Sequence, residues 1–183
     1  MDTQGKSSAT PREMLLQAVS LYQNGHVEAA IKLYQQVLRQ APNDYQALHF
    51  LGVAQGHLGD WITGVQSIER AVALKSDYAD AYNSLGYGLA QLGRYEAAMP
   101  CFERAVALKK DYVEARSNWA DALSLWGARL IKYNRLLEAV ACYEKATALK
   151  PEVTIDYNAW GLALQSVNRF EEAITCYRKA IAL

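Results

Sequence analysis

Apolar and polar residues follow each other along this chain with the spacing of amphipathic helices. Apolar side chains recur three or four positions apart, which places them on one face of an α-helix. Short breaks separate the helical segments, and each break holds one residue that tolerates the left-handed backbone conformation: Gly25, Gly59, Gly93, Asn134 and Asn168. The pattern therefore predicts pairs of antiparallel helices joined by tight turns.

The same pattern returns at a fixed interval. The heptapeptide Glu-Arg-Ala-Val-Ala-Leu-Lys at residues 69–75 is repeated without change 34 residues later, at 103–109. Extending this frame in both directions gives five units: 11–44, 45–78, 79–112, 113–153 and a truncated 154–183. Residues 1–10 are polar and are expected to form a disordered tail.

The repeated residues resemble the tetratricopeptide repeat family along nearly the whole chain. That family has an aromatic residue, then Leu-Gly, then Ala, a second aromatic residue, Ala and Pro. The third unit carries this pattern in Tyr82, Leu85-Gly86, Phe102 and Ala105. The resemblance implies an all-α fold, a right-handed α-solenoid of five stacked helix-turn-helix repeats. Five units exceed the roughly three that a stable array needs.

Expected helix starts agree with this frame. Thr10, Pro11 and Glu13 have the pattern of a capping box with proline at the first helical position. Three further pairs repeat the logic one unit apart: Asn43 with Gln46, Asp77 with Asp80, and Asp111 with Glu114.

The fourth unit is seven residues longer than the others. Seven residues are close to two helical turns, so an added heptad keeps the apolar face in register. We expect the surplus around Gly127 to Tyr133, as a first helix lengthened by two turns with Trp126 and Tyr133 near a projecting end. An irregular loop is the alternative, because Gly127 could end the helix early.

Charge narrows the function classes. The 19 basic and 19 acidic residues cancel. This argues against nucleic acid, whose binding depends on Lys and Arg at phosphates, and against a polybasic membrane surface. No apolar run is long enough for a membrane span. Three cysteines, an odd number, favour a reducing compartment, and a cytoplasmic location is expected. Cys101, Cys142 and Cys176 occupy equivalent places in successive repeats, too far apart for a disulfide.

Catalytic motifs are missing from the sequence. It contains no GxxxxGK, GxGxxG, HExxH or GxSxG pattern, so we expect no enzyme activity and no cofactor. His49 and His57 are eight residues apart, whereas helical metal pairs stand three or four apart, so no metal site is expected.

The candidate binding surface follows from the resemblance. In the family, the second, fifth, ninth and twelfth residues of each first helix line a concave groove. This implies a peptide-binding stripe of His49, Val53, Asp80, Asn83, Tyr87, Ser117, Asp121, Ser124, Asn158 and Gln165. Amides and hydroxyls can pair with a peptide backbone, and Tyr87 offers a stacking surface. Two other readings stay open: Asp80 and Glu114 serve only as helix caps, or the stripe is simply solvated. The chaperone-binding subfamily grips a carboxylate with Lys, Arg and Asn, and this stripe lacks Lys and Arg after Arg12.

The leading interpretation is a protein-interaction scaffold that binds a protein or an extended peptide. One alternative is a self-assembling structural domain. Another is the recruiting arm of a larger enzyme, because residues 102–108 resemble repeats that precede bacterial glycosyltransferases. The last unit ends in Ile174, Tyr177, Ala180 and Ile181 with no helix after them, which suggests a homodimer through this open edge.

Overall fold

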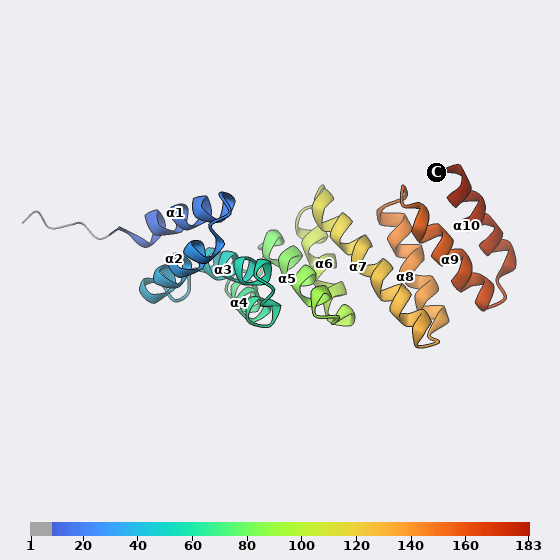
Figure 1. Cartoon of the computed structure of the whole chain (residues 1–183), viewed down its shortest axis with the longest axis horizontal. Helices are drawn as coiled ribbons and strands as arrows, with labels where there is room; N and C mark the ends of the chain where they lie inside the picture. Colours follow the sequence, from blue (N-terminus) through green and yellow to red (C-terminus); the bar gives the residue numbers. More distant parts are fainter. Residues whose placement is uncertain (1–8) are drawn as a thin grey trace, which may run out of the picture. The chain divides into compact units, whose positions relative to one another are not determined.

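The computed structural model describes residues 9–183, and every regular element in that range is an α-helix. Most of the predicted N-terminal tail lies outside the described residues. The ten helices are α1 (Pro11–Gln23), α2 (Val27–Gln40), α3 (Tyr45–His57), α4 (Trp61–Leu74), α5 (Ala79–Gln91), α6 (Tyr95–Leu108), α7 (Val113–Lys132), α8 (Leu136–Leu149), α9 (Thr154–Ser166) and α10 (Phe170–Ala182) (Figure 1).

The chain divides into two compact halves between Leu92 and Gly93. In the N-terminal half, α1 packs on α2 and α3 on α4, and the pairs stack through α2 against α3 and α4 against α5. In the C-terminal half, each of the helices from α6 to α10 packs on the next one along the chain. This is the helical-repeat architecture that the sequence predicts. The handedness of the solenoid stays a prediction.

The turns between first and second helices form as predicted. All five turn residues have positive φ: Gly25 at 81°, Gly59 at 88°, Gly93 at 68°, Asn134 at 57° and Asn168 at 61°. Residues with a side chain avoid this region, except that asparagine tolerates it. The sequence places these residues where a left-handed turn ends each first helix.

Helix starts agree only in part with the expected caps. Thr10 and Glu13 form the predicted capping box. The later caps fall one residue after the expected ones. Asp44 caps α3 by accepting hydrogen bonds from two backbone N–H groups, and Tyr78 and Tyr112 stand at the caps of α5 and α7.

Glycine permits the closest helix contact of the N-terminal half. A Cβ added at Gly52 would lie 2.5 Å from the Gly64 carbonyl oxygen, and one added at Gly64 would lie 2.6 Å from the Gly52 carbonyl oxygen. Two backbones can come this close only when neither residue has a side chain. Helices α3 and α4 therefore meet backbone to backbone at this point.

The long fourth unit begins with one continuous helix. Helix α7 has 20 residues and runs through Gly127, so the predicted lengthening is confirmed and the loop is not formed. A Cβ at Gly127 would meet the Tyr143 ring, and one at Gly161 would meet the Tyr177 ring. Both partners differ by 34 residues, so the normal frame already holds at Gly127. The two added turns therefore lie at the start of α7, and the expectation that they fall around 127–133 is wrong.

A second recurrence supports this register. A surface hollow in the C-terminal half is lined in part by Leu123, Trp126, Glu138, Cys142 and Lys145. Another hollow is lined by the residues 34 positions later: Tyr157, Trp160, Glu172, Cys176 and Lys179. The three cysteines are free, as predicted, and Cys142 and Cys176 are buried.

Candidate functional site

The candidate site is the set of ten stripe residues predicted above, which we call the A-helix stripe. His49 and Val53 lie on α3, and α5 carries Asp80, Asn83 and Tyr87. Helix α7 carries Ser117, Asp121 and Ser124, and α9 carries Asn158 and Gln165. The stripe is therefore divided between the two halves, and each part is described by itself.

In the N-terminal half, Tyr87 is the most prominent residue of the stripe. Its side chain is 40% exposed, and its ring lies edge-on to Trp61 of α4 with 5.4 Å between the ring centroids. The neighbouring Gly88 makes this approach possible, because a Cβ there would lie 2.9 Å from the Trp61 ring. Val53 is half-buried and Asp80 is exposed. Tyr87 is thus an exposed aromatic ring held by a partly buried one.

Two predicted stripe residues are not on the surface. His49 and Asn83 are both buried, so the expectation that they face a ligand is wrong. The Nδ1 atom of His49 lies 2.9 Å from the Tyr78 hydroxyl, and its Nε2 atom lies 2.9 Å from the Ser84 hydroxyl. The fifth position of the first helix is turned towards the neighbouring first helix here, because α3 and α5 contact each other.

Burial sets the charge of this histidine. Loss of solvent lowers the pKa of His49 to about 4, and the charge of Asp80 offsets only part of the effect. Burial also raises the pKa of Tyr78 to about 12. At neutral pH the imidazole is therefore uncharged, with one ring nitrogen donating and the other accepting a hydrogen bond. The group stabilises the α3–α5 packing.

In the C-terminal half, stripe residues join a polar cluster of Asp121, Ser124, Lys150 and Asp156. The Asp121 carboxylate lies 3.0 Å from Lys150 Nζ. Asp156, on α9, is buried and hydrogen bonds with Ser124 of α7. Burial raises the pKa of the Asp156 carboxyl. The cluster therefore carries acidic groups from two first helices and one lysine from the end of α8.

Sequence reasoning missed Asp156 and Lys150. A signal for Asp156 exists, because it occupies the third place of its unit, where two earlier units have the buried alanines Ala47 and Ala81. An acidic group at a buried alanine place needs polar partners. Lys150 lies at the end of its repeat, outside the family's groove positions, and nothing in the pattern singles it out.

The remaining stripe residues of this half lie around the cluster. Ser117 is half-buried and borders a hollow of about 170 Å³ that Lys150 also lines. Asn158 and Gln165 are exposed, and Gln165 accepts a hydrogen bond of 3.1 Å from the Tyr177 hydroxyl. Five predicted residues of this half are thus at the surface or beside the hollow.

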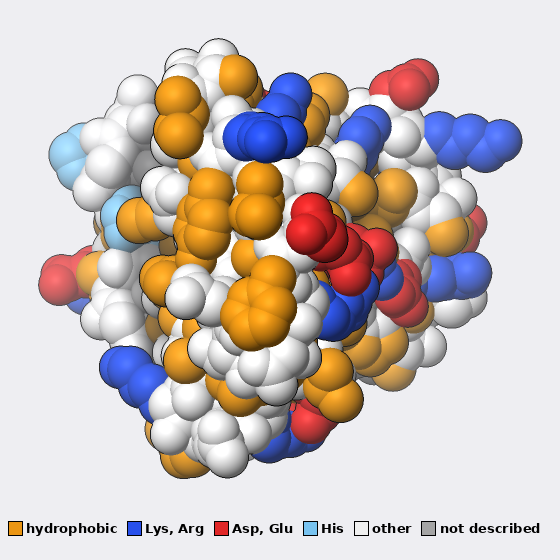
Figure 2. Space-filling model, turned by 90° about the vertical axis from the view of Figure 1, so that its right-hand side faces the viewer, with side chains coloured by type: hydrophobic (Ala, Val, Ile, Leu, Met, Phe, Trp, Pro, Cys, Tyr) orange, Lys and Arg blue, Asp and Glu red, His pale blue; other side chains and the backbone are white. Residues whose placement is uncertain are grey.

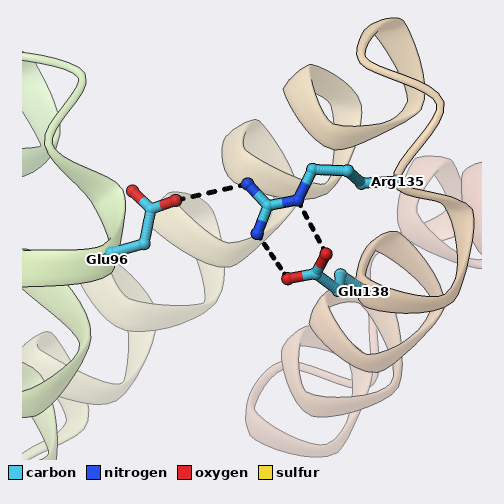
Figure 3. Close-up of polar contacts among 3 residues, drawn as sticks. All are labelled: Glu96, Arg135 and Glu138. Atoms are coloured by element: carbon cyan, nitrogen blue, oxygen red, sulfur yellow. Dashed lines mark hydrogen bonds and ion pairs between the residues drawn. The ribbon is translucent and has the colours of Figure 1, made fainter.

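The second helices of the C-terminal half present a different surface, where charges pair with each other. Arg135 lies between two carboxylates (Figure 3): its Nε donates to Glu138 at 2.7 Å, and a terminal nitrogen lies 3.6 Å from Glu96 of α6. Lys145 of α8 pairs with Glu103 of α6 at 2.7 Å. These pairs are exposed and contribute little stability each. They do leave the charges on this face paired with protein groups.

Metal and membrane chemistry find no support in the residues that the structure describes. Within 9–183 no group of three His, Cys, Asp or Glu side chains is arranged to hold a metal ion. Over the same range, every helix is too short or too polar to cross a membrane.

Comparison with solved structures finds helical-repeat proteins of similar size. One crystal structure of MamA is 27% identical, with a TM-score of 0.69, and covers 90% of this chain and 92% of that one. A second MamA structure is 26% identical with a TM-score of 0.73, covering 94% and 90%. YrrB, described as a TPR protein with an unusual peptide-binding site, is 21% identical with a TM-score of 0.72, covering 93% and 84%.

Family models give the same result from sequence. No curated protein matches the chain. Three tetratricopeptide repeat models match residues 15–61, 79–112 and 157–183. Together with the helix pairs, the 34-residue frame and the positive-φ turns, these matches show that the chain belongs to the tetratricopeptide repeat family.

Proposed function

We propose that this chain binds an extended segment of a partner protein along the exposed part of the A-helix stripe. A protein-interaction scaffold is what the tetratricopeptide repeats support. YrrB, a protein of the same fold, is described as having a peptide-binding site. The chain acts by binding rather than by catalysis, and its place of action is the cytoplasm.

The observation that carries the proposal is Tyr87. Proteins rarely hold a large aromatic ring at the surface by packing it on a tryptophan unless the ring serves recognition. Trp61 fixes the Tyr87 ring, so little side-chain entropy is lost when a ligand packs on it. Asp80, on the same helix and exposed, adds a negative group.

The cluster of Asp121, Ser124, Lys150 and Asp156 supports the same function in the other half. Asp121 is exposed and Asp156 is buried beside Ser124. Carboxylates accept hydrogen bonds from backbone N–H groups and from Lys or Arg side chains. The ligand that suits this surface is therefore a segment with free backbone amides and at least one basic side chain. His49 and Asn83 take no direct part.

The test uses peptides selected from a random display library against the intact chain. Isothermal titration calorimetry then compares the selected peptide on wild type, Tyr87→Ala and Tyr133→Ala. Tyr133 is the matched control, because it is 63% exposed and lies outside the stripe. Tyr87→Ala should weaken binding by roughly 10- to 30-fold, as expected for an interface aromatic that contributes about 1.5–2 kcal/mol. Equal affinity of wild type and Tyr87→Ala, with a loss in Tyr133→Ala, would refute the proposal.

A further inference from the structure

A second surface lies at the α10 end of the C-terminal half. Ile174 is 42% exposed and Ile181 is 85% exposed. Figure 2 looks onto this end of the molecule, where hydrophobic side chains form a broken band with acidic groups to one side. Isolated apolar residues at a surface are ordinary, so the internal repeats must decide whether this band has a role.

The preceding repeat shows how the same face is covered. Ile174 and Ile181 stand 34 residues after Val140 and Thr147 of α8. Those two residues are only 3% and 4% exposed, and α9 packs on α8. The face of α10 is therefore the continuation of an interface that is closed one repeat earlier.

The helix that closes such a face has a recognisable pattern. In α5, Gly88 lies against Trp61 and Val65 of the preceding α4. Ala54 of α3 and Ala163 of α9 hold the same place in their repeats and are buried. A small residue at this point lets two helices approach closely. The occupant must therefore be an amphipathic helix with a small residue at its centre.

A second copy of this chain does not fit that description. Helix α1 has Glu13 and Ser20 at the places where α3 has Ala47 and Ala54, and both are exposed. Docking α1 onto another copy's α10 would bury the Glu13 carboxylate, which already caps Thr10.

Pairing α10 with α10 also lacks the small residue. Ala173 and Ala180, the small residues of that helix with the deepest burial, are already covered in the fold. The geometry therefore points away from self-association at this edge.

We propose that the α10 end face binds an amphipathic helix of a partner protein, which packs on α10 as α9 packs on α8. This site is separate from the A-helix stripe, so it does not depend on the proposed peptide binding. Ile174 and Ile181 contribute the apolar contacts. Asn158, 34 residues after Ser124, offers a polar partner to the ligand helix at the place where Ser124 meets Asp156.

The natural probe is a fluorescein-labelled peptide of residues 154–169, which contains the α9 sequence. Fluorescence polarisation with the intact chain should show saturable binding. The double variant Ile174→Glu, Ile181→Glu should weaken it by at least about tenfold, because two apolar contacts are replaced by carboxylates. Ile62→Glu is the matched control: Ile62 is 66% exposed on α4 and should leave binding unchanged.

A second arm changes the probe and leaves the chain intact. In the probe, Ala163→Leu should abolish binding, because Ala163 occupies the place of closest helix approach. Tyr87→Ala in the chain should bind the probe as wild type does, which separates this site from the stripe. Unchanged affinity in the double variant would overturn the proposal. So would light scattering that shows a wild-type dimer at micromolar concentration and a monomeric double variant, because the occupant would then be a second copy.

Discussion

At the scale of single residues, His49 couples the stability of the fold to pH. The buried imidazole has a pKa of about 4 in the folded chain against 6.5 in a free one. Between these values the unfolded chain binds more protons, so the free energy of unfolding falls as pH falls from 6.5 towards 4. The loss is on the order of 2–3 kcal/mol for this one group.

Replacing His49 by Gln should remove this dependence while keeping a polar side chain near Tyr78 and Ser84. Urea unfolding at pH 7, 5.5 and 4.5 measures the free energy of both proteins. The variant should be less stable at pH 7, and the gap to wild type should shrink at pH 4.5. Carboxylates titrate equally in both proteins, so a constant gap across the range would show that His49 carries no such linkage.

Gly64 sets a limit on helix packing at the same scale. A Cβ at this residue would lie 2.6 Å from the Gly52 carbonyl oxygen, which belongs to the backbone and cannot move away cheaply. Gly64→Ala should therefore lower the free energy of unfolding by about 1–3 kcal/mol, although alanine is the better helix former. Thr63→Ala, on the exposed side of α4, is the control and should be near neutral. A Gly64→Ala chain at least as stable as wild type would contradict the backbone contact.

At the scale of helices, α7 shows what a repeat frame reveals and what it hides. The pattern predicts one lengthened helix, because seven added residues preserve the apolar face. It does not locate them, since a heptad can be added at either end with the same spacing. The Gly127–Tyr143 contact fixes the register. A sequence clue was present, because Ala120-Asp121-Ala122 repeats Ala79-Asp80-Ala81.

Deletion of residues 113–119 should accordingly restore a unit of ordinary length. The shortened chain loses the buried Ala115 and Trp119 but keeps the Gly127–Tyr143 contact. It should unfold cooperatively with a moderately lowered midpoint by circular dichroism. Deletion of 127–133, equal in length, removes Gly127 and the end of α7 and should abolish the cooperative transition. The opposite ranking of the two deletions would place the added turns where the sequence first suggested.

At the scale of the whole molecule, the repeat architecture is readable from sequence and the binding surface only partly so. Periodicity and turn residues such as Gly59 and Asn168 report backbone geometry, which every repeat shares. The stripe depends on which side of a helix each neighbour covers. Asn83 was placed correctly on α5 and is nevertheless buried, and Asp156 joined the polar cluster from a place that is apolar in other repeats.

The most direct test of the peptide-binding account is a map of contacts on the intact chain in solution. Isotope-labelled protein is titrated with the peptide selected above, and the amide and side-chain NMR shifts are followed residue by residue. The account predicts shifts at Tyr87 and Asp80 on α5 and around Asp121 and Ser124 on α7. Shifts confined to the outer face of the second helices, around Arg135 and Lys145, with the stripe unchanged, would contradict it.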